Sequence, residues 1–303
     1  MKNKKKILTL LMVFVLLLML TGCSGKRMTM PISFDNANFF DYILVIPVAW
    51  IMQLFSGLTG NNFGFGIIIT TIIIRTIAWP IYAKSNDLSL KMSIAQPEIA
   101  RLQAKYAGRD DMESKQRMQM EMQQIYKKHN INLLGCFLPF LQMPIFIAVY
   151  QVVQRIHLAG GKWTDKVANK NFLGIDLDGK GNFLFWKEKG SWVGLVLALI
   201  VGVTMFLLNW LATKKPSYQK QTGSHGVQSD EAMQSQKMMK YMQIFMVIMM
   251  VTFSINSNSL AFYWIVGNIY SIGQNLVNRK ISEKKYYKLR NKDLVVTNYD
   301  KKN

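Results

Sequence analysis

One arginine lies inside a long apolar stretch, and no other side chain of the sequence is better placed for chemistry within a membrane. Arg75 stands in the middle of residues 67–82, which are otherwise Ile, Thr, Ala, Trp, Pro and Tyr. In a helix its Cα would lie about 13 Å from Gly66 and from Lys84, near the mid-depth of a bilayer. The guanidinium stays protonated, and burying it in lipid costs from about 3 to more than about 10 kcal/mol. We therefore expect Arg75 to face water or a partner within the protein and to act in function; the alternative is a structural arginine paired with a carbonyl or a neighbouring span.

The N-terminus has the pattern of a secretory signal peptide. Several lysines precede an apolar run, residues 7–20, that ends in Leu-Thr-Gly-Cys. This ending resembles a bacterial lipobox, which predicts that residues 1–22 are removed and that Cys23 carries the lipid, including palmitate. An uncleaved anchor with an incidental cysteine is the alternative. In both cases the chain from residue 24 onward begins outside the cytoplasm.

The other residues whose types could bind a metal or perform catalysis are scattered along the sequence. Cys136 would have no disulfide partner once Cys23 is lipidated, and His129, His157 and His225 do not have metal-ligand spacing with the cysteines. The predicted spans hold no paired acids, no His-Glu-x-x-His and no Ser with His. We expect no metal, no cofactor and no enzymatic activity.

Composition and charge placement predict an all-α, polytopic membrane protein. Half of the 303 residues are apolar, and the formal net charge is +20. Long apolar runs divide residues 65–280 into a core of five transmembrane helices. The expected spans are, approximately, residues 65–83, 133–154, 192–212, 238–254 and 259–278.

The extracellular segment, residues 23–64, contains a further apolar run at 39–58. If this run spanned the membrane, the basic residues after the next span would lie outside, against the positive-inside bias. We therefore favour an interfacial helix on the outer surface, with a span as the open alternative.

Three polar regions are expected in the cytoplasm. Residues 84–131 predict a helical hairpin with helices near 85–106 and 111–129, separated by a turn in which Gly108 suits a C-cap. Residues 213–236 form a polar loop, and residues 281–303 form a basic tail. The tail is suited to anionic lipid headgroups or to ribosomal RNA, and topology control alone is the third possibility.

Several separate motifs resemble the YidC/Oxa1/Alb3 family of membrane protein insertases. The likeness covers about residues 34–280, and the lipobox without a large external domain resembles the Gram-positive branch. The motifs are the lipobox, Arg75 followed by Ala-Trp-Pro at 78–80, Leu-Gln-Met-Pro-Ile-Phe at 141–146, Phe-Leu-Gly-Ile-Asp-Leu at 172–177, Met-Met-Lys-Tyr-Met at 238–242 and Ala-Phe-Tyr-Trp-Ile-Val-Gly-Asn at 261–268.

The resemblance implies a hydrated groove, open to the cytoplasm and to lipid, that contacts entering segments. Arg75 matches its arginine, Gln142 and Trp264 match groove residues, and Tyr263 matches a position on an apolar slide. Family members often carry a glutamine where this chain has Leu208 beside Asn209, so the polar contribution of the third span rests on Asn209.

The resemblance also implies partners and a location. The partners would be nascent membrane proteins, the Sec translocon, the ribosome at the basic tail and anionic lipids, with no DNA. The location would be the bacterial cell membrane, with a lipid-anchored N-terminus outside and the C-terminus in the cytoplasm.

Two other functions remain alternatives. A small-solute transporter or channel would also place a charge within the membrane, but it predicts inverted repeats, which the sequence does not show. A lipoprotein scaffold that only holds partners predicts that Arg75 is dispensable.

Overall fold

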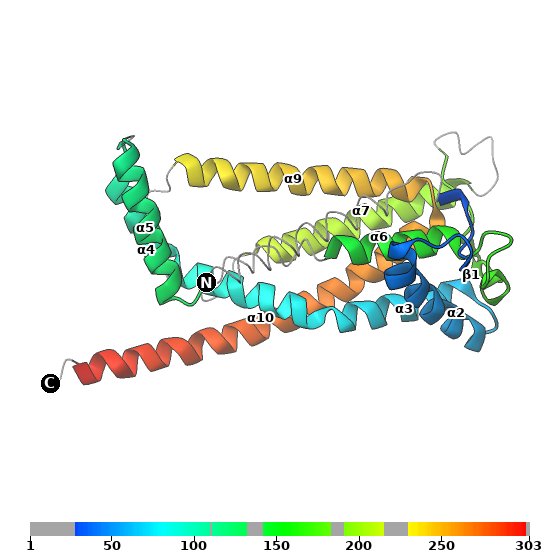
Figure 1. Ribbon diagram of the computed structural model, residues 1–303, viewed down its shortest axis with the longest axis horizontal. Coiled ribbons are helices and arrows are strands. Elements are labelled where there is room, and N and C mark those ends of the chain that lie inside the picture. Colours follow the sequence, from blue (N-terminus) through cyan, green and yellow to red (C-terminus); the bar gives the residue numbers. More distant parts are fainter. Residues whose placement is uncertain (1–27, 110, 132–141, 183–190, 215–229, 301–303) are drawn as a thin grey trace. The chain divides into compact units, whose positions relative to one another are not determined.

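The computed structural model describes residues 28–109, 111–131, 142–182, 191–214 and 230–300, which are mostly helical (Figure 1). The expected signal peptide and Cys23 lie outside these residues. The chain divides into two compact units. The first comprises Met1–Trp79, Leu138–Leu208 and Met246–Ser271, and the second comprises Pro80–Phe137, Asn209–Phe245 and Ile272–Asn303.

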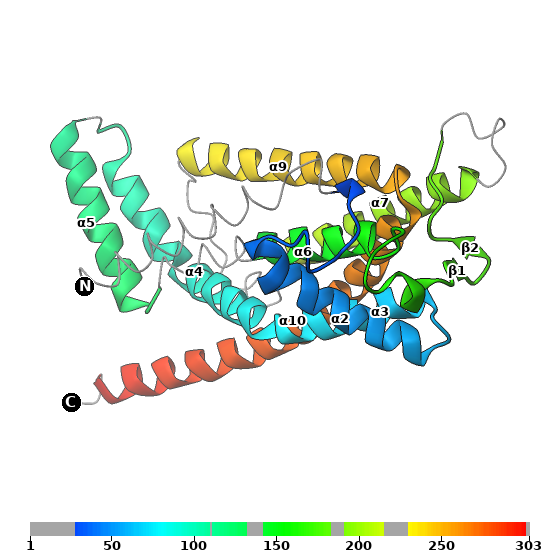
Figure 2. The ribbon, with the colours of Figure 1, turned by 45° about the vertical axis from the view of Figure 1, so that its right-hand side comes forward.

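The first unit begins with two helices that lie side by side (Figures 1 and 2). A π-helical turn, η2 (Asp41–Val45), continues directly into α2 (Ile46–Leu58), and α3 (Phe63–Ile77) follows. Gly66 of α3 faces α2 so closely that a Cβ there would collide with Oγ of Ser56. Small residues at such positions allow apolar helices to pack with their backbones close together.

The first predicted span is interrupted in the structure. α3 ends at Ile77, and α4 (Trp79–Tyr106) starts two residues later. Pro80 explains the break, because it has no N–H to continue the helical ladder but is tolerated in the first turn of a new helix. Arg75 therefore lies in the last turn of α3, where the helix dipole favours a cation, and not in the middle of one long helix.

A buried ion pair holds the segment before α2 against α6 (Gln142–Arg155). Nη1 of Arg155 lies 3.3 Å from Oδ1 of Asp41 and donates to Oε1 of Gln151 at 2.6 Å. Its Nε donates to the carbonyl of Met30 at 2.9 Å. The side chains of Arg155 and Asp41 are 1% and 2% exposed. Because each charge has a partner, the pair fixes the N-terminal segment without leaving an uncompensated buried charge.

A short loop structure follows α6, and it is the exception to the all-α expectation. A 3-10 helix, η4 (Thr164–Val167), precedes two antiparallel strands, β1 (Asn171–Phe172) and β2 (Ile175–Asp176). The two residues between the strands have positive φ, as a two-residue hairpin turn requires. The hairpin is too short to change the helical class.

The remaining helices are long. α7 (Ser191–Thr213) follows the hairpin, and α9 (Asp230–Ile255) and α10 (Asn258–Asp300) are joined by a turn of two residues. The polar loop expected at residues 213–236 therefore ends earlier, because α9 already begins at Asp230. α10 extends well into the segment expected to be a basic tail.

The second unit contains an antiparallel helical pair, α4 with α5 (Met112–Lys128), which Figure 2 shows side by side. α5 begins where the side chain of Asp111 accepts a hydrogen bond from Ser114 N at 2.7 Å. Gly108 has a φ of +79°, as the end of the preceding helix requires. The pair packs around a small apolar cluster of Ala95, Ile99 and Ile131.

Ionic contacts connect the elements of the second unit. Lys105 Nζ lies 2.8 Å from Glu121, and Lys128 Nζ lies 2.9 Å from Glu98, so both ends of the α4–α5 pair are bridged. α10 contacts α4 through an ion pair between Lys285 and Asp87. Beside it, Tyr286 packs against Leu90.

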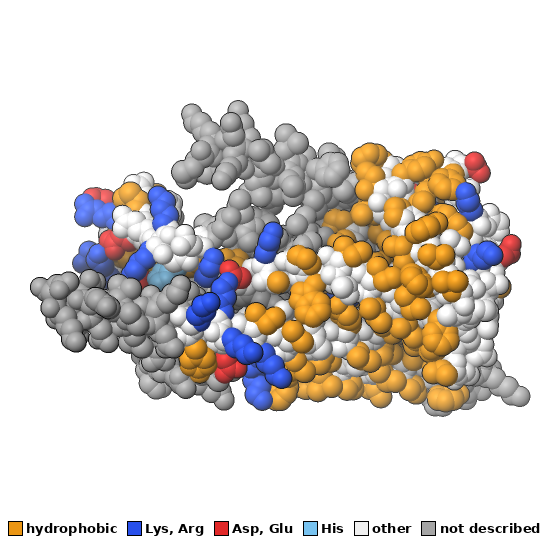
Figure 3. Space-filling view, turned by 90° about the horizontal axis from the view of Figure 1, so that it is seen from below, with side chains coloured by type: hydrophobic (Ala, Val, Ile, Leu, Met, Phe, Trp, Pro, Cys, Tyr) orange, Lys and Arg blue, Asp and Glu red, His pale blue; other side chains and the backbone are white. Residues whose placement is uncertain are grey.

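The surface of the first unit is strongly apolar, as Figure 3 shows for one face. Among the described helices, Asp41–Leu58 and Ser191–Ala212 are long and apolar enough to cross a membrane, and Phe63–Ile77 and Gln243–Ile255 are shorter apolar helices. The run at 39–58, expected at the interface, thus also has the length and composition of a span.

Candidate functional site

The site is built around Arg75, whose side chain is half-buried in the first unit. Nη1 of Arg75 donates a hydrogen bond to Oγ of Ser271 on α10 at 2.9 Å. A guanidinium carries five N–H donors, and no carboxylate among the described residues pairs with it. Donor capacity therefore remains on Arg75 that the described part of the protein does not use.

A glycine on α10 makes room for this guanidinium. A Cβ added to Gly267 would lie 2.9 Å from Nη2 of Arg75, closer than such contacts normally come. Gly267 and Ser271 are four residues apart and so lie on the same face of α10. Gly267 leaves space for the cation, and Ser271 accepts a hydrogen bond from it.

Further polar contacts link α10 to its neighbours. Oγ1 of Thr76 and the hydroxyl of Tyr270 are 2.8 Å apart, next to the break between α3 and α4. The amide of Asn268 donates to Oγ1 of Thr204 on α7 at 3.0 Å. Polar side chains thus lie along α10 within an apolar setting.

Two of the predicted site residues lie on α10 but are buried. Trp264 and Tyr263 are each 4% exposed and belong to the apolar core of the first unit. The Trp264 ring stacks on Phe146 at 6.2 Å between centroids, and its buried indole N–H has no hydrogen-bond partner among the described residues. Trp264 lies one helical turn from Gly267, so the structure brings it near Arg75. Tyr263, which the resemblance matches to an apolar slide, is covered by core side chains.

The other predicted residues lie elsewhere in the chain. Gln142 is the first residue of α6, and its side chain lies outside the described part. Asn209 lies on α7 in the part of the chain assigned to the second unit. Cys23 precedes the described residues.

Comparison with known proteins decides the family. The sequence profile of the family described as "60Kd inner membrane protein" matches residues 54–285 of the chain. This chain belongs to that family. Curated relatives of this chain align with about 90% of its length.

Three such relatives have insertase names. The membrane protein insertase YidC 2 of Listeria innocua is 30% identical over 276 residues, 90% of this chain and 83% of that protein. The membrane protein insertase MisCA of Bacillus subtilis is 30% identical over 276 residues, 90% of this chain and 91% of that protein. The membrane protein insertase YidC 2 of Bacillus anthracis is 31% identical over 273 residues, 89% of this chain and 92% of that protein. The resemblance to the YidC family inferred from the motifs is thereby confirmed, and this family is one of insertases and not of enzymes.

Sequence reasoning missed Ser271, which accepts a hydrogen bond from Arg75, and Gly267, which leaves space for the guanidinium. A signal for them exists. Polar and small residues recur three or four positions apart through the apolar first half of α10, at Gly267, Asn268, Ser271 and Asn275. This spacing marks one helical face.

Proposed function

We propose that this membrane protein inserts apolar segments of nascent membrane proteins into the bilayer, and that Arg75 gives their polar flanks a transient binding site. The insertase names of relatives that cover most of the chain support the activity. The unused donor capacity of Arg75 supports the mechanism.

The partial exposure of Arg75 is the observation that carries the mechanism. A guanidinium that was fully paired and shielded from water would have no hydrogen-bond donors free to bind a passing chain. Arg75 has one hydrogen bond from the described residues, to a neutral hydroxyl. A carboxylate flanking an entering segment can accept two parallel hydrogen bonds from a guanidinium. This pairing of opposite charges is stronger than the single bond to the neutral hydroxyl of Ser271.

Release of the segment follows from its composition. Once the polar flank has been held part-way into the membrane, the apolar helix leaves for lipid, which is favourable by about 25 cal/mol per Å² of apolar surface removed from water. The interaction with Arg75 is reversible, so it lowers the barrier without trapping the client. No nucleotide is required for this sequence of steps.

The proposed topology places five spans in the membrane, with the N-terminus outside, lipidated at Cys23, and the C-terminus in the cytoplasm. In this arrangement the α4–α5 pair lies in the cytoplasm and α2 lies at the outer interface. The basic end of α10 would meet the ribosome or anionic lipid, and the Sec translocon would act beside the chain for some clients.

Insertion by purified protein in liposomes tests the role of Arg75. The client is a single-span protein with an acidic external tail, compared with the same client after its tail acids are changed to amides. Arg75→Ala should lower insertion of the acidic client about tenfold, as expected for loss of a charge-assisted hydrogen bond, and Arg75→Lys should retain much of it. The amide client should be less affected.

The matched control is Arg117→Ala, which removes an exposed arginine that pairs with Glu113 on its own helix. Its insertion rate should equal that of the unaltered protein. Undiminished insertion of the acidic client by Arg75→Ala would remove the mechanism. If the unaltered protein inserted neither client but let small solutes pass through the liposome membrane, the channel alternative would be favoured.

A further inference from the structure

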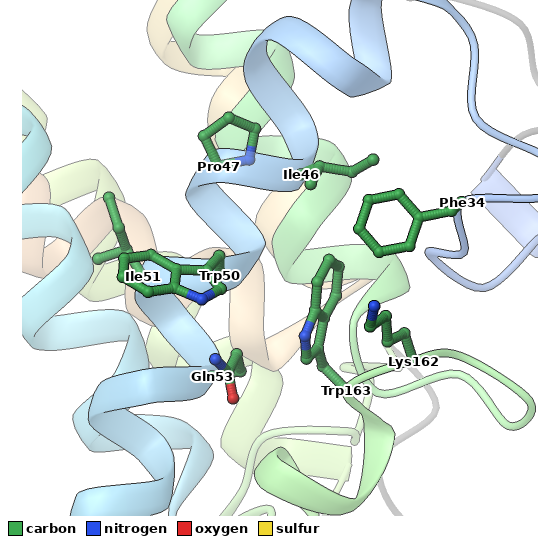
Figure 4. Close-up of a pocket in the computed structure, with 8 residues that line it drawn as sticks. All are labelled: Phe34, Ile46, Pro47, Trp50, Ile51, Gln53, Lys162 and Trp163. Carbon is green, nitrogen blue, oxygen red and sulfur yellow. The ribbon is translucent and has the colours of Figure 1, made fainter.

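An open depression lies on the first unit, away from Arg75, between α2 and the loop that contains η4 (Figure 4). Its volume is about 630 Å³, within the range of about 300–1,000 Å³ that is usual for ligand pockets. Its walls are aromatic and aliphatic. Its lining includes Phe34, Pro47, Trp50, Gln53, Lys162 and Trp163.

The depression is preformed by contacts among its own walls. The rings of Phe34 and Trp163 meet edge to face at 6.0 Å between centroids, and Trp163 is 8% exposed. The backbone N–H of Lys162 donates to the carbonyl of Ile32 at 3.0 Å, which joins the N-terminal segment to the loop. The aromatic wall is therefore held in place without a ligand.

One cation stands at the rim of this aromatic wall. Nζ of Lys162 lies 4.1 Å from the centroid of the Phe34 ring and 6.0 Å from that of Trp163. Among the described residues no carboxylate pairs with it. A partly solvated ammonium over aromatic faces is only weakly stabilised by them, less than by an anion. The rim thus presents an uncompensated positive charge directly above an apolar surface.

The opposite wall, on α2, is exposed and apolar. Trp50 is 54% exposed, and Leu54 and Leu58 on the same helix are 38% and 74% exposed. Exposed tryptophan beside exposed leucine is typical of helices at the boundary between headgroups and acyl chains. This holds whether α2 lies in the interface or crosses the membrane.

We propose that this depression is a binding site for an anionic phospholipid, with the phosphate on Lys162 and one acyl chain among Phe34, Pro47, Trp50 and Trp163. Gln53, which also lines the depression, supplies a neutral hydrogen-bonding group for the headgroup. A cation above an apolar trough matches the amphipathic order of a lipid. A lipid attached to Cys23 lacks the phosphate that Lys162 would recognise, so the free phospholipid fits the charge better. Binding would join the N-terminal segment, α2 and the η4 loop.

Quenching of tryptophan fluorescence by brominated lipids tests this site in the full-length protein. The membranes are phosphatidylcholine with a small fraction of phosphatidylglycerol, and one of the two lipids is brominated at a time. The part due to Trp50 is obtained by subtracting the signal of Trp50→Phe, because the chain has 7 tryptophans. Brominated phosphatidylglycerol should quench this part about fivefold more, per mole fraction, than brominated phosphatidylcholine.

Two lysine variants separate a bound lipid from general attraction. Lys162→Gln should abolish the preference for phosphatidylglycerol, whereas Lys166→Gln, which removes an exposed charge from the same loop, should keep it. Equal quenching by both lipids in the unaltered protein would overturn the proposal, as would an unchanged preference in Lys162→Gln. Quenching that appears only in Cys23→Ser would overturn it in favour of the protein's own lipid.

A second measurement does not depend on tryptophan variants. Native mass spectrometry of the protein released from mixed-lipid membranes should show phosphatidylglycerol retained on the unaltered chain and on Lys166→Gln. Retention should fall on Lys162→Gln. Equal retention on all three proteins would contradict the assignment.

Discussion

Arg75 and Ser271 are 196 positions apart in the sequence, and their side chains meet through a hydrogen bond of 2.9 Å. The cation is thus positioned by α10, not by its own helix. The contact orients the guanidinium through a neutral group, so its charge is not neutralised. A change to α10 beside the guanidinium should therefore alter insertion without removing the charge of Arg75.

Gly267→Ala tests this positioning. The added Cβ would lie 2.9 Å from Nη2 of Arg75, so the guanidinium must shift. We expect insertion of an acidic client to fall severalfold, while thermal stability stays the same or rises slightly, because alanine is favoured over glycine within helices by about 1 kcal/mol. Insertion into liposomes and a thermal unfolding curve measure the two effects.

The matched control is Gly273→Ala on the same helix. A Cβ there meets nothing within 4 Å, so this variant should insert clients normally. If both glycine variants lost insertion equally, the flexibility of α10 and not the space for Arg75 would be the cause.

The buried pair of Asp41 and Arg155 should contribute strongly to stability. Asp41→Ala leaves Arg155 buried without its counter-charge, and breaking such a pair costs about 3–5 kcal/mol. Unfolding in denaturant, with the protein in detergent micelles, measures the change. Asp35→Ala, in the exposed part of the same segment, should have little effect; a similarly small effect of Asp41→Ala would show that the pair contributes little.

The stability of the α4–α5 pair should depend on pH through Glu98. The hydrogen bond from Lys128 lowers the pKa of Glu98 and outweighs the opposing effect of burial, and His129 adds to the lowering. As the pH falls, the unfolded state binds the proton first, so this stabilisation is present above the unfolded pKa of about 4.3 and is lost as the pH falls through the lower folded pKa.

Hydrogen-exchange protection of α4 and α5 amides, corrected for intrinsic rates, measures this effect. Glu98→Gln should reduce the protection at neutral pH and flatten its decline toward acid pH. Glu113→Gln, which alters a pair within one helix, is the comparison. An equal acid-induced decline in the unaltered protein and in Glu98→Gln would refute the role of Glu98.

A test of the basic end of α10 needs a truncation that keeps the contacts of this helix with α4. Lys285 and Tyr286 contact α4, so deletion of residues 281–303 would damage the second unit as well as remove charge. Deletion of residues 289–303 keeps both contacts. It should weaken co-sedimentation with ribosomes at low salt and have less effect at high salt, where the charge interaction is already screened.

Unchanged ribosome binding after the shorter deletion would leave anionic lipid or topology control as the role of this segment. Binding to vesicles with and without phosphatidylglycerol distinguishes these two. Lower vesicle binding would identify lipid as the partner.

The sequence by itself determined features that depend on neighbouring residues. The helix break at Gly108, the start of α5 at Asp111 and the long apolar runs all follow from local propensity and hydrophobic pattern. The family was also accessible from the sequence, since its motifs are short and occur in a fixed order. The break at Pro80 was readable in the same way, although residues 65–83 were predicted as one span.

Only the tertiary structure decided which distant residues meet. Nothing in the pattern around Asp41 indicates Arg155, and nothing around Arg75 indicates Gly267 or Ser271. These partners depend on which faces of separate helices pack together, and helical periodicity defines a face without naming its neighbour. The burial of Tyr263 follows for the same reason, because a side chain on an apolar helix face is covered or left in lipid according to the helices that pack beside it.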